Sequence, residues 1–200
     1  PVSWGWTGYF YSAKDEGNDR FASHADRRAH GGEPFLLWFL KQVRTHDLKA
    51  GRRTLDVLDV HFYPQGAHVY SKQADAATQA LRLRSPRSLF DSAYRDESWI
   101  GEPVRLIPRL KEWIAAGYPG TKIGITEWNF GAEEDITGGL ATADTLGIFG
   151  REGVELANYW TCPATDSPTG LAFRLFRRPD SDSSATGLGD LSCAARSGAP

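Results

Sequence analysis

Three groups of residues that could act together chemically each lie where a short apolar run ends: His61-Phe62-Tyr63, Glu127-Trp128 and Tyr159-Trp160. If these runs are neighbouring parallel strands, their carboxyl ends meet at one edge of the sheet, where such folds carry their chemistry. A glutamate beside a tyrosine hydroxyl and a histidine is kept ionised and oriented, as a carboxylate nucleophile requires. Taken singly, His61 and Trp160 are more often structural, and Glu127 could be an exposed loop residue. Their shared placement makes Glu127 the candidate nucleophile.

The elements that must position these groups alternate along the chain. Runs rich in apolar, β-branched or aromatic residues predict strands, and wide apolar stripes after a proline or before a glycine predict helices. We predict strands at residues 2–11, 55–63, 122–126 and 154–160, and helices at 34–50, 103–116 and 139–151. Pro108 either kinks its helix or marks its start.

The remaining segments carry weaker patterns. Residues 12–32 are polar, with glycine breakers, and predict a loop, whereas 172–176 predict a further extended piece. Residues 65–98 show no sustained hydrophobic periodicity, apart from a short helix predicted at 74–83. A connection of this length without firm secondary structure is typical of a binding loop.

The alternation predicts an α/β fold with right-handed parallel βαβ units. No glycine-rich phosphate-binding pattern follows any strand, which argues against a nucleotide-binding sheet. Four strands are half of a (β/α)8 TIM barrel, which typically takes about 250 residues. The chain also contains no Met. We therefore expect a partial (β/α)8 TIM barrel over residues 1–178, as a fragment of a longer chain, and a loose Ser/Gly-rich tail at 179–200 that starts a truncated following segment.

Composition narrows the class of partner. The net charge is −2 with acidic and basic residues interspersed, so we expect no nucleic acid and no membrane as a partner. Aromatic residues make up 12% of the chain and include seven Trp, which favours carbohydrate, because flat rings stack on sugars. Cys162 and Cys193 are two isolated cysteines and give only weak support for a disulfide.

Four longer motifs resemble glycoside hydrolase family 44, and the resemblance covers most of residues 1 to about 190. The motifs are Asp56–Gln65 (DVLDVHFYPQ), Tyr94–Ile100 (YRDESWI), Leu106–Trp113 (LIPRLKEW) and Tyr118–Asn129 (YPGTKIGITEWN). Enzymes of this family are secreted endo-β-1,4-glucanases and xyloglucanases, so the resemblance implies a β-1,4-linked polysaccharide substrate. In their barrel superfamily the acid/base glutamate follows the fourth strand and the nucleophile follows the seventh. The resemblance therefore implies that this chain holds about strands five to eight.

The resemblance also implies a role for each candidate site residue. Glu127 would be the nucleophile, and His61, Tyr63 and Trp160 would shape the subsite where the bond breaks. Trp128 and Trp6 are further candidates for stacking on a sugar ring.

The second carboxyl group of a retaining glycosidase is not apparent. The family's acid/base lies in an Asn-Glu motif, which occurs nowhere in these 200 residues. Glu33 and Glu102 lie at predicted helix starts, which we place away from the strand ends, and the acidic stretch 133–135 predicts a solvated loop. We expect the acid/base to lie outside this chain, and the chain alone to be inactive.

Three histidines, His24, His30 and His46, show no metal-ligand spacing, so we expect no cofactor and no zinc. A structural calcium site built from loop carboxylates stays open. Two other interpretations stay open as well. One is a non-catalytic carbohydrate-binding barrel. The other is a metal-dependent hydrolase, which needs ligands at several strand ends, where only His61 qualifies.

Overall fold

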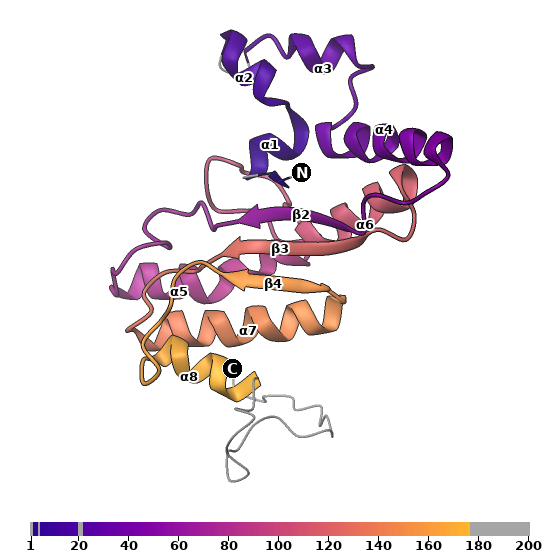
Figure 1. The fold of residues 1–200 in the computed structure, drawn as a ribbon. Coiled ribbons are helices and arrows are strands. Elements are labelled where there is room, and N and C mark those ends of the chain that lie inside the picture. The colour runs from indigo at the N-terminus through magenta and orange to yellow at the C-terminus, as the bar shows by residue number, and fades with distance from the viewer. Residues whose placement is uncertain (1, 4, 20–21, 177–200) are drawn as a thin grey trace.

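The computed structural model describes residues 2–3, 5–19 and 22–176 (Figure 1). One sheet of four parallel strands follows the order of the chain. The strands are β1 (Val2–Ser3), β2 (Val57–Phe62), β3 (Lys122–Trp128) and β4 (Leu156–Tyr159). The prediction of an α/β fold with a parallel sheet is confirmed.

Helices connect the strands and follow the last one. They are α1 (Trp6–Phe10), α2 (Ala13–Asp19), α3 (Ala25–Ala29), α4 (Phe35–Ala50), α5 (Ala76–Arg84), the 3-10 helix η1 (Ser85–Leu89), α6 (Leu106–Gly117), α7 (Ile136–Glu152) and α8 (Pro168–Phe176). Right-handed crossovers between strands in sequential order place the connecting helices on one face of the sheet. In agreement, α4 contacts α6 and α5 contacts α7. Figure 1 shows α1–α3 beyond one end of this arrangement and α8 beyond the other.

The main helix boundaries follow local backbone chemistry. Gly51 ends α4 with a φ of 65°, a left-handed conformation that glycine adopts without steric cost. Pro108 lies in the first turn of α6, where its missing N–H removes no helical hydrogen bond, so it marks the start of the helix. The side chain of Asp135 accepts the N–H of Thr137 at 2.9 Å and caps α7.

The two faces of β2 differ in burial. Leu58, Val60 and Phe62 are buried, whereas Val57, Asp59 and His61 alternate with them and are only half-buried. The buried set packs into a core with apolar residues of α4, α6, β3 and α7. The strand therefore turns its apolar face to the helices and its polar residues to the opposite face.

The prediction of a strand over residues 2–11 is wrong past Ser3, because Trp6–Phe10 is helical. Aromatic residues favour strands mainly through packing, which a helix can also supply. Here Tyr9 is 1% exposed, and Phe10 packs edge-on against Trp113 of α6 with ring centroids 5.5 Å apart.

The prediction of a loop over residues 12–32 is also wrong, since α2 and α3 lie there. The start of α3 is stabilised from a distance in sequence. The carboxylate of Asp15 accepts the main-chain N–H groups of Asp26 and Arg27 at 2.7 and 3.1 Å. A cap supplied by a residue so far upstream leaves no local pattern.

The extended piece expected at 172–176 belongs to α8. Ser167 precedes Pro168, and its hydroxyl accepts the N–H of Gly170 at 3.0 Å. This Ser-Pro start is a helix signal that the sequence contains. The tail predicted at 179–200 lies outside the described residues.

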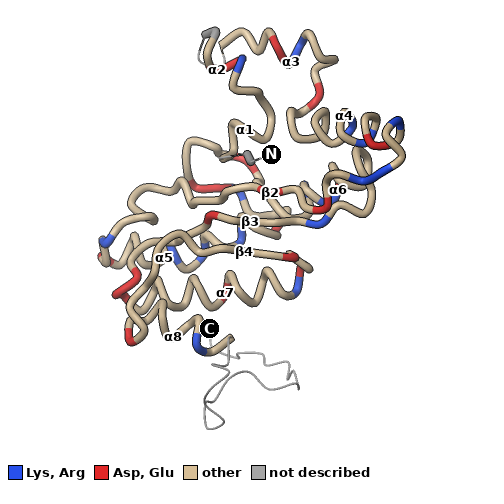
Figure 2. The backbone as a smooth tube through the Cα atoms, in the orientation of Figure 1, with Lys and Arg blue, Asp and Glu red and all other residues tan. Residues whose placement is uncertain are grey.

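Charge is spread over the fold. Figure 2 shows acidic and basic residues interleaved along the elements, as the net charge of −2 suggests. Within residues 2–3, 5–19 and 22–176, no helix is both long and apolar enough to cross a membrane.

Candidate active site

A β-bulge in β3 sets the geometry of the site. The register pairs Val60 with Ile125 and then His61 with Glu127, so Thr126 is the extra residue. One extra residue reverses the alternation of side chains, which turns Glu127 to the same face of the sheet as His61. The carboxylate of Asp59 stabilises the bulge by accepting the N–H of Thr126 at 3.1 Å and its hydroxyl at 2.6 Å.

Glu127 contacts both neighbours that the sequence assigns to it. Nδ1 of His61 lies 3.0 Å from Oε2 of Glu127, and the hydroxyl of Tyr63 donates to the same oxygen at 3.1 Å. Burial and the Glu127 carboxylate raise the pKa of Tyr63 above its ordinary value, which keeps the phenol protonated as a donor. Within the described part of the chain, no hydrogen bond reaches Oε1 of Glu127. One carboxylate oxygen is thus anchored and the other is open.

His61 is positioned by a residue that the sequence did not single out. The hydroxyl of Tyr9 in α1 donates to the main-chain carbonyl of His61. Burial raises the pKa of Tyr9, so the hydroxyl keeps its proton and remains a donor. This contact ties α1 to the end of β2.

Trp160 is placed beside the glutamate strand with its side chain in solvent. Its main-chain N–H donates to the carbonyl of Trp128 at 3.0 Å, and its own carbonyl accepts from Nδ2 of Asn129 at 2.9 Å. The side chain is 52% exposed. The backbone is therefore held while the indole stays available for contact.

The expectation that Trp128 offers a stacking surface is wrong. This residue is 1% exposed, and its ring packs against Phe149, Tyr159 and Phe173. The cause is the bulge: successive side chains point to opposite faces, so turning Glu127 to one face turns Trp128 toward the helices.

Trp6 follows β1 and is half-buried. It lines a small cavity together with His61 and Tyr63, and a larger one of about 370 Å³ together with Trp99 and Glu102. The placement of Glu102 away from the strand ends is thus wrong. A helix that follows a parallel strand begins at the edge where that strand ends, so a helix start lies on the same side as the candidate site.

The acidic stretch 133–135 behaves in two ways. Glu134 is exposed, as predicted, but Glu133 is half-buried and hydrogen-bonded. Its Oε1 accepts from Nδ2 of Asn129 at 2.9 Å, from the hydroxyl of Tyr159 at 3.2 Å and from the hydroxyl of Thr161. Two of these donors come from β4 and the residues after it, so no local pattern in the sequence could reveal this arrangement.

Comparison with known proteins shows similarity in both sequence and fold. Residues 1–66 match the model of glycoside hydrolase family 44. Endoglucanase A of Paenibacillus lautus is 42% identical over 162 residues, which are 76% of this chain and 23% of that protein. The crystal structure of CelM2, a bifunctional glucanase-xylanase from a metagenome library, superposes with a TM-score of 0.85 at 45% identity. The chain belongs to glycoside hydrolase family 44.

The family 44 chain is shorter than these relatives. CelM2 matches over 94% of this chain, which corresponds to 37% of CelM2. A xyloglucanase of the same family from Paenibacillus polymyxa, solved with xyloglucan, has a TM-score of 0.75 and 31% identity over the same shares of the two chains. This chain thus spans less than a quarter of the Paenibacillus lautus protein and little more than a third of the solved structures.

Among the residues that the structure describes, no three His, Cys, Asp or Glu side chains gather in a way that could hold a metal ion. Cys162 is exposed, and Cys193 lies outside the described residues. The absence of a cofactor and the question of structural calcium stay predictions.

Proposed function

We propose that this chain is the C-terminal half, strands five to eight, of a (β/α)8 barrel that hydrolyses internal β-1,4-glucosidic bonds with retention of configuration. Glu127 is the nucleophile. The observation that carries the proposal is the anchoring of Oε2 by His61 and Tyr63, which leaves Oε1 open. Sequential parallel strands with helices on one face support a barrel segment, as does the match to little more than a third of solved family members.

The first chemical step forms a glycosyl-enzyme. Oε1 of Glu127 attacks the anomeric carbon, the bond from that carbon to the glycosidic oxygen breaks, and the leaving oxygen takes a proton from a general acid. In the second step the same group, now a base, removes a proton from water. The water oxygen attacks the anomeric carbon and the ester bond to Glu127 breaks. Two inversions give net retention.

The neighbours of Glu127 have distinct roles in this scheme. Tyr63 stabilises the carboxylate by donating to Oε2, and in this scheme it also hydrogen-bonds the ring oxygen of the sugar. His61 uses Nδ1 on Glu127, so its Nε2 remains for a sugar hydroxyl. The exposed indole of Trp160 stacks on a sugar ring, and residues 65–98 wall a cleft for a cellulose- or xyloglucan-type polymer.

The general acid comes from outside these 200 residues. Retaining enzymes need two carboxyl groups about 5–5.5 Å apart, and no Asn-Glu pair occurs in the sequence. The 200-residue chain alone therefore releases no reducing sugar from xyloglucan or carboxymethyl cellulose. We also place the intact protein outside the cell, where such polymers lie.

The test uses the coding sequence upstream of Pro1. The longer polypeptide should release reducing ends from xyloglucan, with the β-anomer appearing first by NMR. Glu127→Gln should lower kcat at least about a thousandfold, because the nucleophile is lost. Glu112→Gln on α6, which removes an exposed carboxylate paired with Arg105, is the matched control and should leave kcat unchanged.

Two outcomes would overturn the proposal. Full activity in Glu127→Gln would remove the nucleophile assignment. Binding of xyloglucan without hydrolysis by the longer polypeptide would favour the rival function, a non-catalytic carbohydrate-binding barrel.

A further inference from the structure

Trp160 carries an exposed indole on a main chain whose two polar groups are both hydrogen-bonded. The indole is 52% exposed, so packing against the core contributes little to its direction. The main-chain N–H of Trp160 donates to the carbonyl of Trp128 at 3.0 Å, and its carbonyl accepts from Nδ2 of Asn129 at 2.9 Å. The direction of the indole therefore depends on the main chain at this position and on what fixes it.

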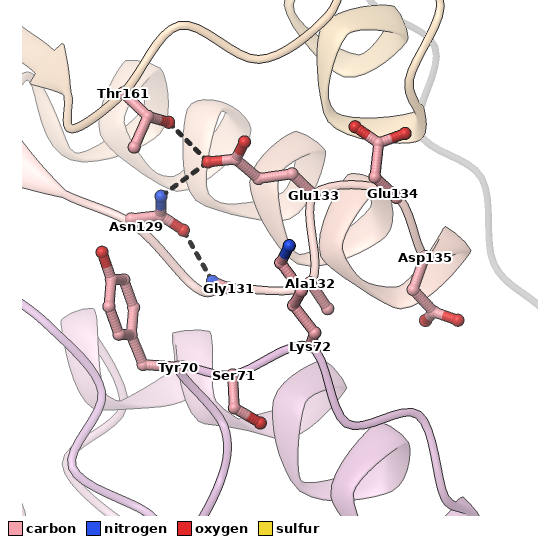
Figure 3. A pocket seen from close by; sticks show the side chains of 10 residues that line it. All are labelled: Tyr70, Ser71, Lys72, Asn129, Gly131, Ala132, Glu133, Glu134, Asp135 and Thr161. Atoms are coloured by element: carbon pink, nitrogen blue, oxygen red, sulfur yellow. Dashed lines mark hydrogen bonds between the residues drawn. The ribbon is translucent and has the colours of Figure 1, made fainter.

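The two residues that flank Trp160 are held by one carboxylate. Tyr159 precedes Trp160 and Thr161 follows it. The hydroxyls of both neighbours donate to Oε1 of Glu133, that of Tyr159 at 3.2 Å. The same oxygen accepts from Nδ2 of Asn129 at 2.9 Å (Figure 3). Glu133 is thus the common acceptor for three donors arranged around a single exposed tryptophan.

Thr161 has a backbone conformation that needs such a contact. Its φ is 118°, a value that non-glycine residues rarely adopt. Conformations of this kind persist only where surrounding contacts enforce them, and they are concentrated at functional sites. The enforcing contact here is the hydrogen bond from the Thr161 hydroxyl to Glu133. Because a charged acceptor makes a hydrogen bond roughly twice as strong as a neutral one, a carboxylate is well suited to hold this turn.

The donors around Glu133 have fixed roles. Burial, and then the charge of Glu133, raise the pKa of Tyr159, so the phenol keeps its proton and remains a donor. Oδ1 of Asn129 accepts the N–H of Gly131 at 2.6 Å, which leaves Nδ2 for the two acceptors, Glu133 and the carbonyl of Trp160. The cluster therefore specifies one placement of the main chain at Trp160.

Glu133 is itself fixed by two helices. Its carbonyl accepts the N–H of Thr169, in the first turn of α8, at 3.3 Å. Asp135, two residues further along the chain, caps α7, and α7 packs against α8. The carboxylate therefore has a rigid base, as a residue that positions another requires.

We propose that Glu133 is a positioning residue, which fixes the main chain on both sides of Trp160 and so sets the direction in which the indole meets a bound β-1,4-linked polymer. The inference rests on the proposed function and deepens it, because it gives the stacking surface its support. Glu133 acts through Trp160 and not on the reacting atoms. Its loss should weaken binding of the polymer and leave the chemical step at Glu127 largely intact.

The experiment uses the longer polypeptide that includes the upstream coding sequence. Glu133→Ala should raise KM for xyloglucan by about tenfold and change kcat by less than about twofold, the pattern left when binding common to substrate and transition state is lost. Glu133→Gln keeps an acceptor oxygen and should restore most of the loss in KM. A folding defect would instead lower the active fraction, and with it kcat, without changing KM.

A double-mutant cycle shows whether Glu133 acts through Trp160. Binding of cellotetraose is measured by calorimetry in the longer polypeptide that carries Glu127→Gln, where hydrolysis is blocked. Trp160→Ala should weaken binding by about tenfold, and adding Glu133→Ala should weaken it by less than about twofold more, because the indole that Glu133 positions is gone.

Two further variants separate positioning from direct contact and from a general effect of charge. Glu133 lines the cavity drawn in Figure 3, whereas Tyr159 does not, so Tyr159→Phe tests the positioning without altering a cavity wall. It removes one donor, keeps the ring that packs against Trp128, and should weaken cellotetraose binding by about threefold. Asp166→Ala, which removes an exposed carboxylate of the β4–α8 loop, is the control and should bind as the parent does.

Unchanged KM and unchanged cellotetraose affinity in both Glu133→Ala and Tyr159→Phe would overturn the proposal. An effect of Glu133→Ala that is equally large with and without Trp160 would overturn it too, because Glu133 would then contact the sugar directly. The same holds if the parent does not bind cellotetraose or if Trp160→Ala binds as well as the parent. Loss of hydrolysis in Glu127→Gln judges the proposed function separately, since the binding cycle needs no turnover.

Discussion

The carboxylate of Asp59 binds both the main-chain N–H and the hydroxyl of Thr126, at 3.1 and 2.6 Å. Thr126 is the residue left unpaired by the bulge in β3. A bulge needs a partner for the N–H that the ladder no longer uses, and Asp59 is that partner. The orientation of Glu127 thus depends on a residue one strand away.

Replacing Asp59 tests this dependence. Asp59→Ala should lower the free energy of unfolding by about 1–3 kcal/mol, because two donors of Thr126 lose their acceptor. Asp59→Asn keeps one acceptor oxygen and should lose less. Urea denaturation followed by circular dichroism measures both variants.

The control for this experiment is Asp56→Ala, whose side chain is 85% exposed. It should change stability by less than about 0.5 kcal/mol. In the longer polypeptide, Asp59→Ala should also reduce kcat. Unchanged stability and unchanged kcat would show that the bulge does not need Asp59.

Arg82 links the loop that follows β2 to the segment that follows β3. It is fully buried and donates to the carbonyls of Val69, Ser71, Gln73 and Phe130 and to the hydroxyl of Thr137. Arg82→Met should lower the free energy of unfolding by about 3 kcal/mol, because several buried carbonyls lose a charged donor.

A matched control is Arg84→Met, two residues further along α5, which loses an exposed ion pair with Glu97. It should cost less than about 1 kcal/mol. Equal losses in the two variants, measured by urea denaturation, would contradict the role assigned to Arg82.

Two glycines should respond in opposite ways to alanine. Gly131 has a φ of 74°, and a Cβ there would lie 2.7 Å from the carbonyl oxygen of Val69. Gly131→Ala should therefore destabilise the chain by about 1–3 kcal/mol. Gly150 lies within α7, and an added Cβ there would meet no atom within 4 Å beyond its chain neighbours and the backbone of the helix itself, so Gly150→Ala should stabilise the chain by up to about 1 kcal/mol. Thermal unfolding compares the two, and the same sign of change in both would count against this reasoning.

Acid stability should depend on Asp47. Burial opposes ionisation of this carboxyl, but hydrogen bonds from Thr54, His46 and Tyr118 outweigh it and lower the pKa of Asp47 well below its ordinary value. A folded-state pKa below the unfolded one adds stability that is complete above the unfolded value of about 3.9 and is lost as the pH falls through the folded one. In Asp47→Asn, the part of the acid-induced loss of folding stability that comes from protonation of Asp47 should be absent.

The measurement is the free energy of unfolding between about pH 5 and pH 2. The difference between the parent chain and Asp47→Asn should shrink steadily as the pH falls. Asp56→Asn, whose exposed carboxylate lies 3.8 Å from Arg53, serves as the control and should follow the parent curve. A constant difference across the range would show that Asp47 does not titrate with folding.

Much of the fold was accessible from the sequence, because α4, α6, β2 and β3 each bury apolar residues on one face or along a continuous run. The meeting of His61, Tyr63 and Glu127 followed from the same reasoning, since parallel strands end at one edge. The bulge could not be predicted from the sequence. Its extra residue changes which side chains of β3 face the helices, and the order of apolar and polar residues is compatible with either arrangement. For that reason the burial of Trp128 could not be foreseen.

Other features depend on contacts between distant segments. Glu133 looked like part of a solvated loop because its donors lie 4 to 28 residues away. The helix α3 depends on Asp15 in the same way. Only α8 carried a local signal, Ser167-Pro168, that could have been used.

The central claim is that Glu127 forms a covalent bond to the sugar. A 2-deoxy-2-fluoro-cellobioside with a good leaving group slows hydrolysis of the glycosyl-enzyme more than its formation, so the intermediate accumulates. After trypsin digestion of the inhibited longer polypeptide, the account predicts one added glycosyl group on the peptide from Ile123 to Arg151, at Glu127 in tandem mass spectra. A label on any other carboxylate, or hydrolysis with inversion and no label, would contradict it.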